Sequence, residues 1–87
     1  MYSLLYIFTK RGNEVPRITG KLEIENCIQE LRTEMVWTQQ ELADQIGVTR
    51  GTIIALERGS YNPSLELAFR LAKVFKTTVE KIFFERG

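Results

Sequence analysis

The sequence predicts an all-α fold in which five short helices surround one small apolar core, preceded by an N-terminal extension over residues 1–21. Three observations predict this fold class. Apolar residues recur at helical spacing in successive short segments. Ser or Thr residues stand just before several of these segments, where a side-chain oxygen caps a helix start. Glycines follow two of them, where a helix end favours the left-handed backbone that only glycine adopts cheaply.

Length and composition limit the chain to one small domain and exclude several kinds of chemistry. With 87 residues, 44% of them hydrophobic, the chain can form one core. One cysteine and no histidine exclude an intramolecular disulfide, Cys/His zinc sites and histidine-based catalytic triads. We therefore expect no catalytic residue, no metal site and no cofactor. Cys27 gives no sign of an oxidising compartment, so a cytoplasmic protein is expected.

The formal net charge of +1 provides no general attraction to nucleic acid. The charge is unevenly distributed along the chain. Residues 24–45 carry a single cation, Arg32, among five acidic side chains, whereas residues 1–22 carry four cations and one acidic residue, Glu14. Any basic surface for a nucleic acid must therefore be local.

The sequence leaves two structures open for the N-terminal extension. Met1–Phe8 is apolar, but it is far shorter than the roughly 20 residues that a membrane span needs, so no membrane partner is expected. A Gly-Asn turn signal at residues 12–13 allows Tyr2–Lys10 to pair with Glu14–Thr19 as a β-hairpin. A flexible arm is the alternative, given equal weight. Such an apolar hairpin should pack on the helical domain or on a second chain.

The first predicted helix spans Leu22–Met35. Its apolar stripe consists of Ile24, Ile28, Leu31 and Met35. Cys27 lies beside this stripe and is expected to be a small core residue, because no histidine is available to activate its thiol. Trp37, just beyond the helix, is expected to be a wedge in the core.

The most informative segment is Thr38–Gly59, with the sequence TQQELADQIGVTRGTIIALERG. Thr38 is a good N-cap, and Glu41 three residues later completes a capping box. The second helix therefore begins at Gln39 and extends to about Gln45. Gly47 follows the last apolar position of this helix and is expected to end it.

A third helix is predicted between its N-cap, Thr49, and Gly59, which ends it. Ala43 is small where the third helix would cross the second, so the two helices must form a tightly bent pair rather than an antiparallel hairpin. This pattern indicates a helix-turn-helix. The apolar residues expected to hold the pair together are Leu42, Ile46, Val48, Ile53 and Leu56.

The fourth helix is predicted over Leu65–Phe75. Pro63 disfavours helix at the residue before it, and Ser64 then caps the new helix. The residues available to the core from this helix are Leu65, Ala68, Leu71, Ala72 and Phe75.

A fifth helix is predicted from Val79 to about Phe84, after a cap at Thr78. Val79, Ile82 and Phe83 are expected to close the core. Phe84 is left over for an apolar patch, alone or with Tyr2 or Tyr6, which is covered either by a second subunit or by the chain's own N-terminal arm.

The segment from Ile24 to Phe84 resembles the phage repressor and Cro-like family, the xenobiotic-response-element-type regulators. Besides the helix-turn-helix, the matching motifs are ELR at Glu30–Arg32, ERG-x-Y-N-P-S-L-E-L-A at Glu57–Ala68 and T-V-E-K-I-F at Thr78–Phe83. The resemblance implies a five-helix lambda-repressor-like DNA-binding domain over residues 22–87, with double-stranded DNA as its partner. It also implies a structural ion pair between Arg32 and Glu57.

Two positions depart from the family, which often has glycine where this chain has Val36 and Lys76. A β-branched residue resists a positive φ angle. The end of the first helix, or the loop after it, is therefore expected to be reshaped.

The outward face of the third helix is expected to contact base edges in the major groove. Its base-contacting residues are expected to be Thr49, Arg50, Gly51, Thr52, Ile54 and Ala55. All of them except Thr52, which is included for its hydroxyl, coincide with the family's DNA-facing positions. Arg50 can bind guanine through two hydrogen bonds, and Gly51 lets the backbone approach the DNA. The residues expected to contact phosphates are Gln39, Gln40, Arg58, Ser60, Tyr61 and Asn62.

One such unit offers few phosphate contacts and has an acidic flank, so it should bind DNA weakly alone. We therefore predict a homodimer on a partly palindromic operator with half-sites about 34 Å apart, acting by family analogy as a repressor. The alternative is a protein-interaction module, such as an antitoxin-like or adaptor protein, which the apolar arm and acidic first helix would suit. No segment indicates a small-molecule effector.

Overall fold

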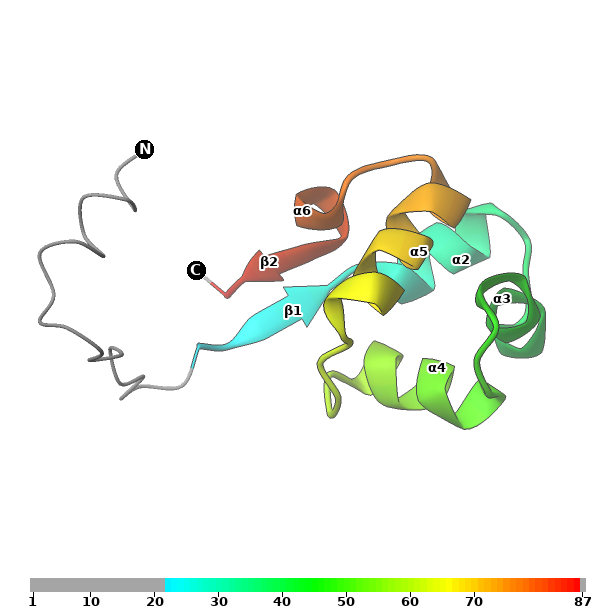
Figure 1. The fold of residues 1–87 in the computed structure, drawn as a ribbon, viewed down its shortest axis with the longest axis horizontal. Coiled ribbons are helices and arrows are strands. Elements are labelled where there is room, and N and C mark those ends of the chain that lie inside the picture. The colour runs from blue at the N-terminus through cyan, green and yellow to red at the C-terminus, as the bar shows by residue number, and fades with distance from the viewer. Residues whose placement is uncertain (1–21, 87) are drawn as a thin grey trace, which may run out of the picture.

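The computed structural model describes residues 22–86, which form five short helices and a two-stranded antiparallel sheet (Figure 1). In chain order the elements are β1 (Ile24–Asn26), α2 (Ile28–Glu34), α3 (Gln39–Ile46), α4 (Arg50–Arg58), α5 (Leu65–Phe75), α6 (Val79–Ile82) and β2 (Phe83–Glu85). The predicted five-helix domain is confirmed. The predicted hairpin of residues 2–19, with Tyr2 and Tyr6, lies outside the described residues. No helix within residues 22–86 is long and apolar enough to cross a membrane.

The sheet joins the two ends of the described chain. β1 pairs with β2 so that Ile24 lies opposite Glu85 and Asn26 opposite Phe83. The prediction of a helix over Leu22–Met35 is therefore wrong at its start, because residues 24–26 are extended. The helical spacing of Ile24 and Ile28 is genuine, but the strand that pairs with Ile24 lies at the far end of the chain, where local periodicity cannot detect it.

The fifth helix is shorter than predicted. α6 ends at Ile82 rather than near Phe84, and the chain continues directly into β2. The Cys27 amide donates to the Ile82 carbonyl at 3.0 Å, which fixes this switch from helix to strand. Arg86 extends the pairing, since its amide donates to the Glu23 carbonyl at 2.9 Å. Its guanidinium also contacts the carboxylates of Glu25 at 2.5 Å and Glu23 at 3.4 Å. The hydrogen bond that Arg86 Nε donates to the Glu25 carboxylate is the main cause that raises the pKa of the Arg86 guanidinium.

All five helices contribute to one core. Its buried residues are Ile28, Leu42, Ala43, Ile46, Ile53, Leu56, Leu67, Leu71, Ala72, Phe75 and Ile82. Trp37 packs against Phe75 with ring centroids 6.0 Å apart, which confirms its prediction as a core wedge. Two predicted core residues are wrong: Leu65 is 72% exposed and Met35 is 40% exposed. The buried face of α5 is rotated toward Leu67, so Leu65 points outward.

The predicted helix ends are largely confirmed. Thr38 and Glu41 form a complete capping box. Gly47 and Gly59 adopt left-handed conformations, with φ angles of 76° and 77°. Val36 and Lys76 are also left-handed, with φ angles of 60° and 56°. The expectation that Val36 would resist this conformation is therefore wrong. The turn is closed by the Val36 amide, which donates to the Thr33 carbonyl at 3.0 Å, and by the Trp37 amide, which donates to the Arg32 carbonyl at 3.1 Å.

Val36→Gly is expected to stabilise the domain by about 1 kcal/mol. A non-glycine residue in the left-handed region costs about 1–3 kcal/mol, partly offset by the greater entropy of glycine in the unfolded chain. The Val36 side chain is 85% exposed, so its removal loses little packing. Urea unfolding at fixed protein concentration measures the change. Lys76→Gly, which removes an unbranched side chain, should give a smaller gain; equal or reversed effects would contradict strain at Val36.

Candidate nucleic-acid interface

α3 and α4 form the tightly bent helix pair that the sequence predicts. The Val48 amide donates to the Ala43 carbonyl at 3.0 Å, which closes the turn between them. Ala43 is fully buried where the helices cross. On α4, Ile53 and Leu56 are also fully buried, so the opposite face of this helix is turned toward solvent.

The predicted base-contacting residues lie at the start of α4 and along its outward side, with unequal exposure. Thr49, Arg50 and Gly51 are exposed, so the first turn of the helix is the most accessible part. Thr52, Ile54 and Ala55 are only partly exposed. Any direct contact with bases would therefore concentrate on the first turn.

Two hydroxyl groups at this first turn are already coupled. Thr49 Oγ1 accepts the Thr52 amide at 3.3 Å, as an N-cap does, and lies 3.1 Å from Thr52 Oγ1. Because one hydroxyl donates to the other, the pair retains a single free hydroxyl proton for a ligand. Either hydroxyl can be the donor, so the free proton can be on Thr49 or on Thr52.

The predicted phosphate-contacting residues separate into two groups. Arg58, Ser60, Tyr61 and Asn62 are exposed at the end of α4 and in the loop that follows it, although the Ser60 hydroxyl donates to the Ala55 carbonyl at 3.3 Å. Gln39 and Gln40, at the start of α3, are instead engaged within the protein: the Gln39 amide donates to Glu57 at 3.1 Å and the Gln40 amide to Asp44 at 2.9 Å. Each amide nitrogen keeps a second hydrogen for another acceptor.

Arg32 and Glu57 join three helices through a partly buried ion pair. Arg32 Nε lies 2.7 Å from Glu57 Oε2, and Arg32 Nη1 donates to the Trp37 carbonyl at 2.8 Å. The side chains are only 14% and 6% exposed. Glu57 also accepts from Gln39, so one carboxylate at the end of α4 binds groups from α2 and α3. This network fixes the direction in which α4 projects.

Two further contacts that the sequence analysis missed hold the ends of the helix pair. The Asn26 amide donates to the Leu56 carbonyl at 2.8 Å, near the end of α4. Arg70 Nη1 donates to the Ile46 carbonyl at 3.1 Å, at the end of α3. Both contacts join segments at least 24 residues apart, so no local sequence signal could have revealed them.

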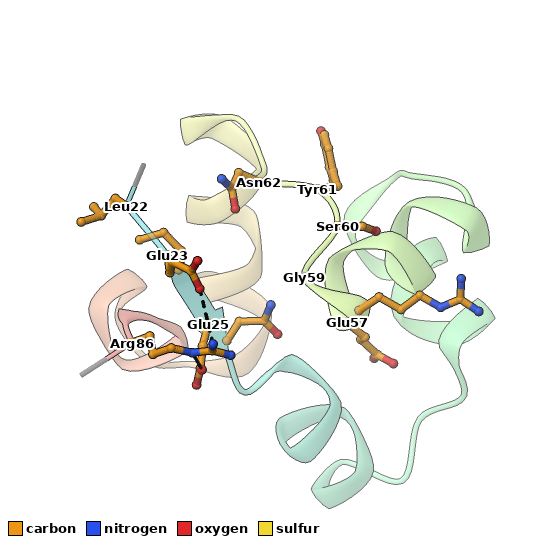
Figure 2. A pocket seen from close by; sticks show the side chains of 12 residues that line it. Leu22, Glu23, Glu25, Glu57, Gly59, Ser60, Tyr61, Asn62 and Arg86 are labelled. Atoms are coloured by element: carbon orange, nitrogen blue, oxygen red, sulfur yellow. Dashed lines mark hydrogen bonds and ion pairs between the residues drawn. The ribbon is translucent and has the colours of Figure 1, made fainter. Parts of the chain in front are cut away.

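A polar groove of about 510 Å³ lies beside α4, between β1 and the loop after the helix (Figure 2). Glu23, Glu25 and Arg86 line one wall, where the arginine already binds both carboxylates. Within the described residues no cluster of His, Cys, Asp and Glu side chains could hold a metal ion. Burial, and secondly the Glu30 carboxylate, raise the pKa of the Cys27 thiol, so it stays protonated and weakly nucleophilic.

The sequence of this chain is similar to those of known proteins. A helix-turn-helix family model matches residues 28–82. An HTH-type transcriptional regulator from Archaeoglobus fulgidus is 52% identical over 56 residues, which cover 64% of this chain and 79% of the relative. A second such regulator, from Methanothermobacter thermautotrophicus, is 54% identical over 61 residues, 69% of this chain and 88% of the relative.

More distant similarity extends to a phage protein and to a solved structure. The transcriptional repressor RstR of the cryptic phage CTXphi, from Vibrio cholerae, is 36% identical over 55 residues, 63% of this chain and 50% of the repressor. The crystal structure of a candidate DNA-binding protein from Bacteroides fragilis superposes with a TM-score of 0.63 over 70% of this chain and 98% of that one. At 23% identity, this structure supports the fold alone.

Arg32→Met is expected to lower the free energy of unfolding by about 3 kcal/mol, because it leaves the Glu57 carboxylate buried without its cation. Urea unfolding measures the loss. Arg86→Met is the matched control, since it breaks ion pairs whose side chains are largely exposed, and it should have a much smaller effect. Similar losses in the two variants would show that the burial of the Arg32 pair is unimportant.

Proposed function

The chain belongs to the Cro/C1-type helix-turn-helix family of transcriptional regulators, and from this premise we propose that residues 22–87 bind double-stranded DNA at a specific sequence. We further propose that the protein acts as a homodimer and represses transcription. The observation that carries the proposal is the capped, exposed first turn of α4, which the buried Ile53 and Leu56 and the Arg32–Glu57 pair hold outward.

Sequence preference is proposed to depend mainly on Arg50. Its side chain lies in the exposed first turn of α4, where a guanidinium can donate two hydrogen bonds to O6 and N7 of guanine. Ile54 and Ala55 can contact only thymine methyl groups, and they are partly buried. The shape of the DNA is therefore expected to contribute part of the specificity.

Position on the duplex is proposed to come from contacts with phosphates on either side of α4. The start of α3 offers free backbone amides and the remaining amide hydrogens of Gln39 and Gln40. After α4, the exposed side chains of Arg58, Tyr61 and Asn62 offer one cation and two neutral donors. A single unit therefore has modest electrostatic attraction, which favours a pair of units on half-sites about 34 Å apart.

Repression is the finer part of the proposal and is supported by the similarity to a phage repressor. A DNA-bound domain can block transcription simply by occupying a promoter. The alternative of a protein-interaction module predicts a stable complex with another protein and no DNA binding.

Selection of bound sequences from random duplex DNA, at stated salt, tests the proposal. We expect enrichment of a two-fold symmetric motif whose half-sites are about one helical turn apart and contain a guanine. No enrichment over the input at low salt would reject sequence-specific binding.

Arg50→Ala and Arg58→Ala form a matched pair, because each removes one exposed arginine from α4. Arg50→Ala should weaken binding by about 1–3 kcal/mol and relax the preference at one base position. Arg58→Ala should weaken specific and random DNA alike and reduce the salt slope of binding by about one. Titration of both DNAs at several salt concentrations measures these effects. An equal loss on both DNAs for Arg50→Ala would remove it from the base-contacting residues.

Gly51→Ala separates folding from DNA contact. A Cβ added at Gly51 would meet only Thr49 Oγ1, at 3.8 Å, so alanine fits in the free protein. Alanine should stabilise α4 by about 0.5–1 kcal/mol. If the backbone of the first turn approaches DNA closely, the same variant should bind DNA at least several-fold more weakly. Thermal unfolding and DNA titration of one preparation measure both; unchanged affinity would show that the backbone at Gly51 stays away from the DNA.

A further inference from the structure

α5 carries two large apolar side chains on the outside of the domain. Leu65 is 72% exposed and Phe69 is 58% exposed. They are four residues apart, so they lie on the same face of the helix, one turn from each other. The side of α5 that faces the core is formed by other residues, among them the buried Leu67 and Leu71. An exposed apolar stripe of this kind marks an interaction surface.

The charges beside this stripe run from acidic to basic along the helix. Glu66 lies in the first turn of α5, where one of its carboxylate oxygens pairs with Arg70 at 2.8 Å, and Lys73 lies in the last turn. If a second α5 packs antiparallel about a two-fold axis near Phe69, Glu66 of each copy lies opposite Lys73 of the other. The surface is therefore complementary to itself, which is what an isologous dimer interface requires.

The position of the helix-turn-helix fits such an axis. Arg70 lies about 100° around α5 from Phe69, and its guanidinium reaches the Ile46 carbonyl at the end of α3. The end of α3 therefore lies to one side of the Phe69 face, and Figure 1 shows α4 and α6 on opposite sides of α5. A two-fold axis between antiparallel copies of α5 points in this sideways direction. Both copies of α4 would then project toward the same side, as a palindromic DNA site requires.

We propose that a second copy of this chain docks on the outward face of α5, through the apolar pair Leu65 and Phe69 with Glu66 and Lys73 at its rim. The inference rests on the proposed DNA-binding function for its biological meaning, because it names the surface through which the homodimer forms. A stable interface buries at least about 1,200 Å² in total. Two apolar side chains per copy form only a small centre, so we expect a weak dimer in the absence of DNA.

Sedimentation of the full chain without DNA tests the surface. Phe69→Asp should raise the dimer dissociation constant by about 30-fold or more, as loss of a central anchor does. Phe84→Asp is the matched control, because Phe84 is also an exposed phenylalanine, 42% exposed, but lies on β2. It should leave dimerisation essentially unchanged. The reverse pattern would assign the interface to the sheet and overturn the proposal, as would a wild-type protein that stays monomeric at all concentrations.

Reversing the charges of Glu66 and Lys73 gives a second test, which does not depend on the folding of the Phe69 variant. Glu66→Lys and Lys73→Glu should each weaken self-association, because each places like charges opposite one another. An equimolar mixture of the two should form mixed dimers, in which both pairs are again of opposite charge. Native mass spectrometry counts the mixed species. A random distribution of species, or no dimer in the mixture, would overturn the antiparallel arrangement.

Binding to a single DNA half-site separates this inference from the proposed function. Phe69→Asp should bind a half-site duplex as the wild type does, while losing the added affinity for the full palindrome. A wild-type dimer that is disrupted by Phe69→Asp but binds no DNA would support the α5 interface and reject the DNA-binding proposal. Equal affinities of the variant and the wild type for the full palindrome would reject the α5 interface.

Discussion

The direction of α4 depends on the Glu57 carboxylate, which accepts hydrogen bonds from Arg32 on α2 and from Gln39 on α3. Short helices are marginal alone, so their relative angles must be fixed by contacts between them. A buried carboxylate can fix the angles between helices, because the folded state is strongly destabilised when such a carboxylate lacks its partners. Arg32 also binds the Trp37 carbonyl, which links the loop before α3 to the same network. The exposed first turn of α4 is a consequence of this inner arrangement.

The remaining polar contacts act at helix ends, where backbone groups lack partners within the helix. Asn26 binds a carbonyl near the end of α4, and Arg70 binds one at the end of α3. Within the described residues every buried side-chain nitrogen and oxygen has a partner. The helix-turn-helix is therefore held beside its central turn by α5 and near the end of α4 by β1. These two elements contribute no predicted DNA contact, yet they decide how rigidly the exposed face of α4 is presented.

The exposed faces of α4 and α5 differ in chemistry. The exposed face of α4 is polar, with Arg50 and Arg58 at its two ends, whereas the outward face of α5 is apolar at its centre. The proposed functions of the two faces depend on each other. A unit with few phosphate contacts needs a second copy for affinity, and a small apolar interface gains stability when both copies bind one DNA molecule. Binding would then depend steeply on protein concentration.

The sequence alone determined where most of the helices begin and end. Thr38, Thr49, Ser64, Gly47 and Gly59 act through groups within a few residues of themselves, so local chemistry suffices to predict them. Tertiary structure decided the rest. Residues 24–26 became a strand because their partner lies at the other end of the chain. Leu65 faces outward because the other helices determine which side of α5 is buried. Both outcomes depend on contacts between distant segments, which no local pattern contains.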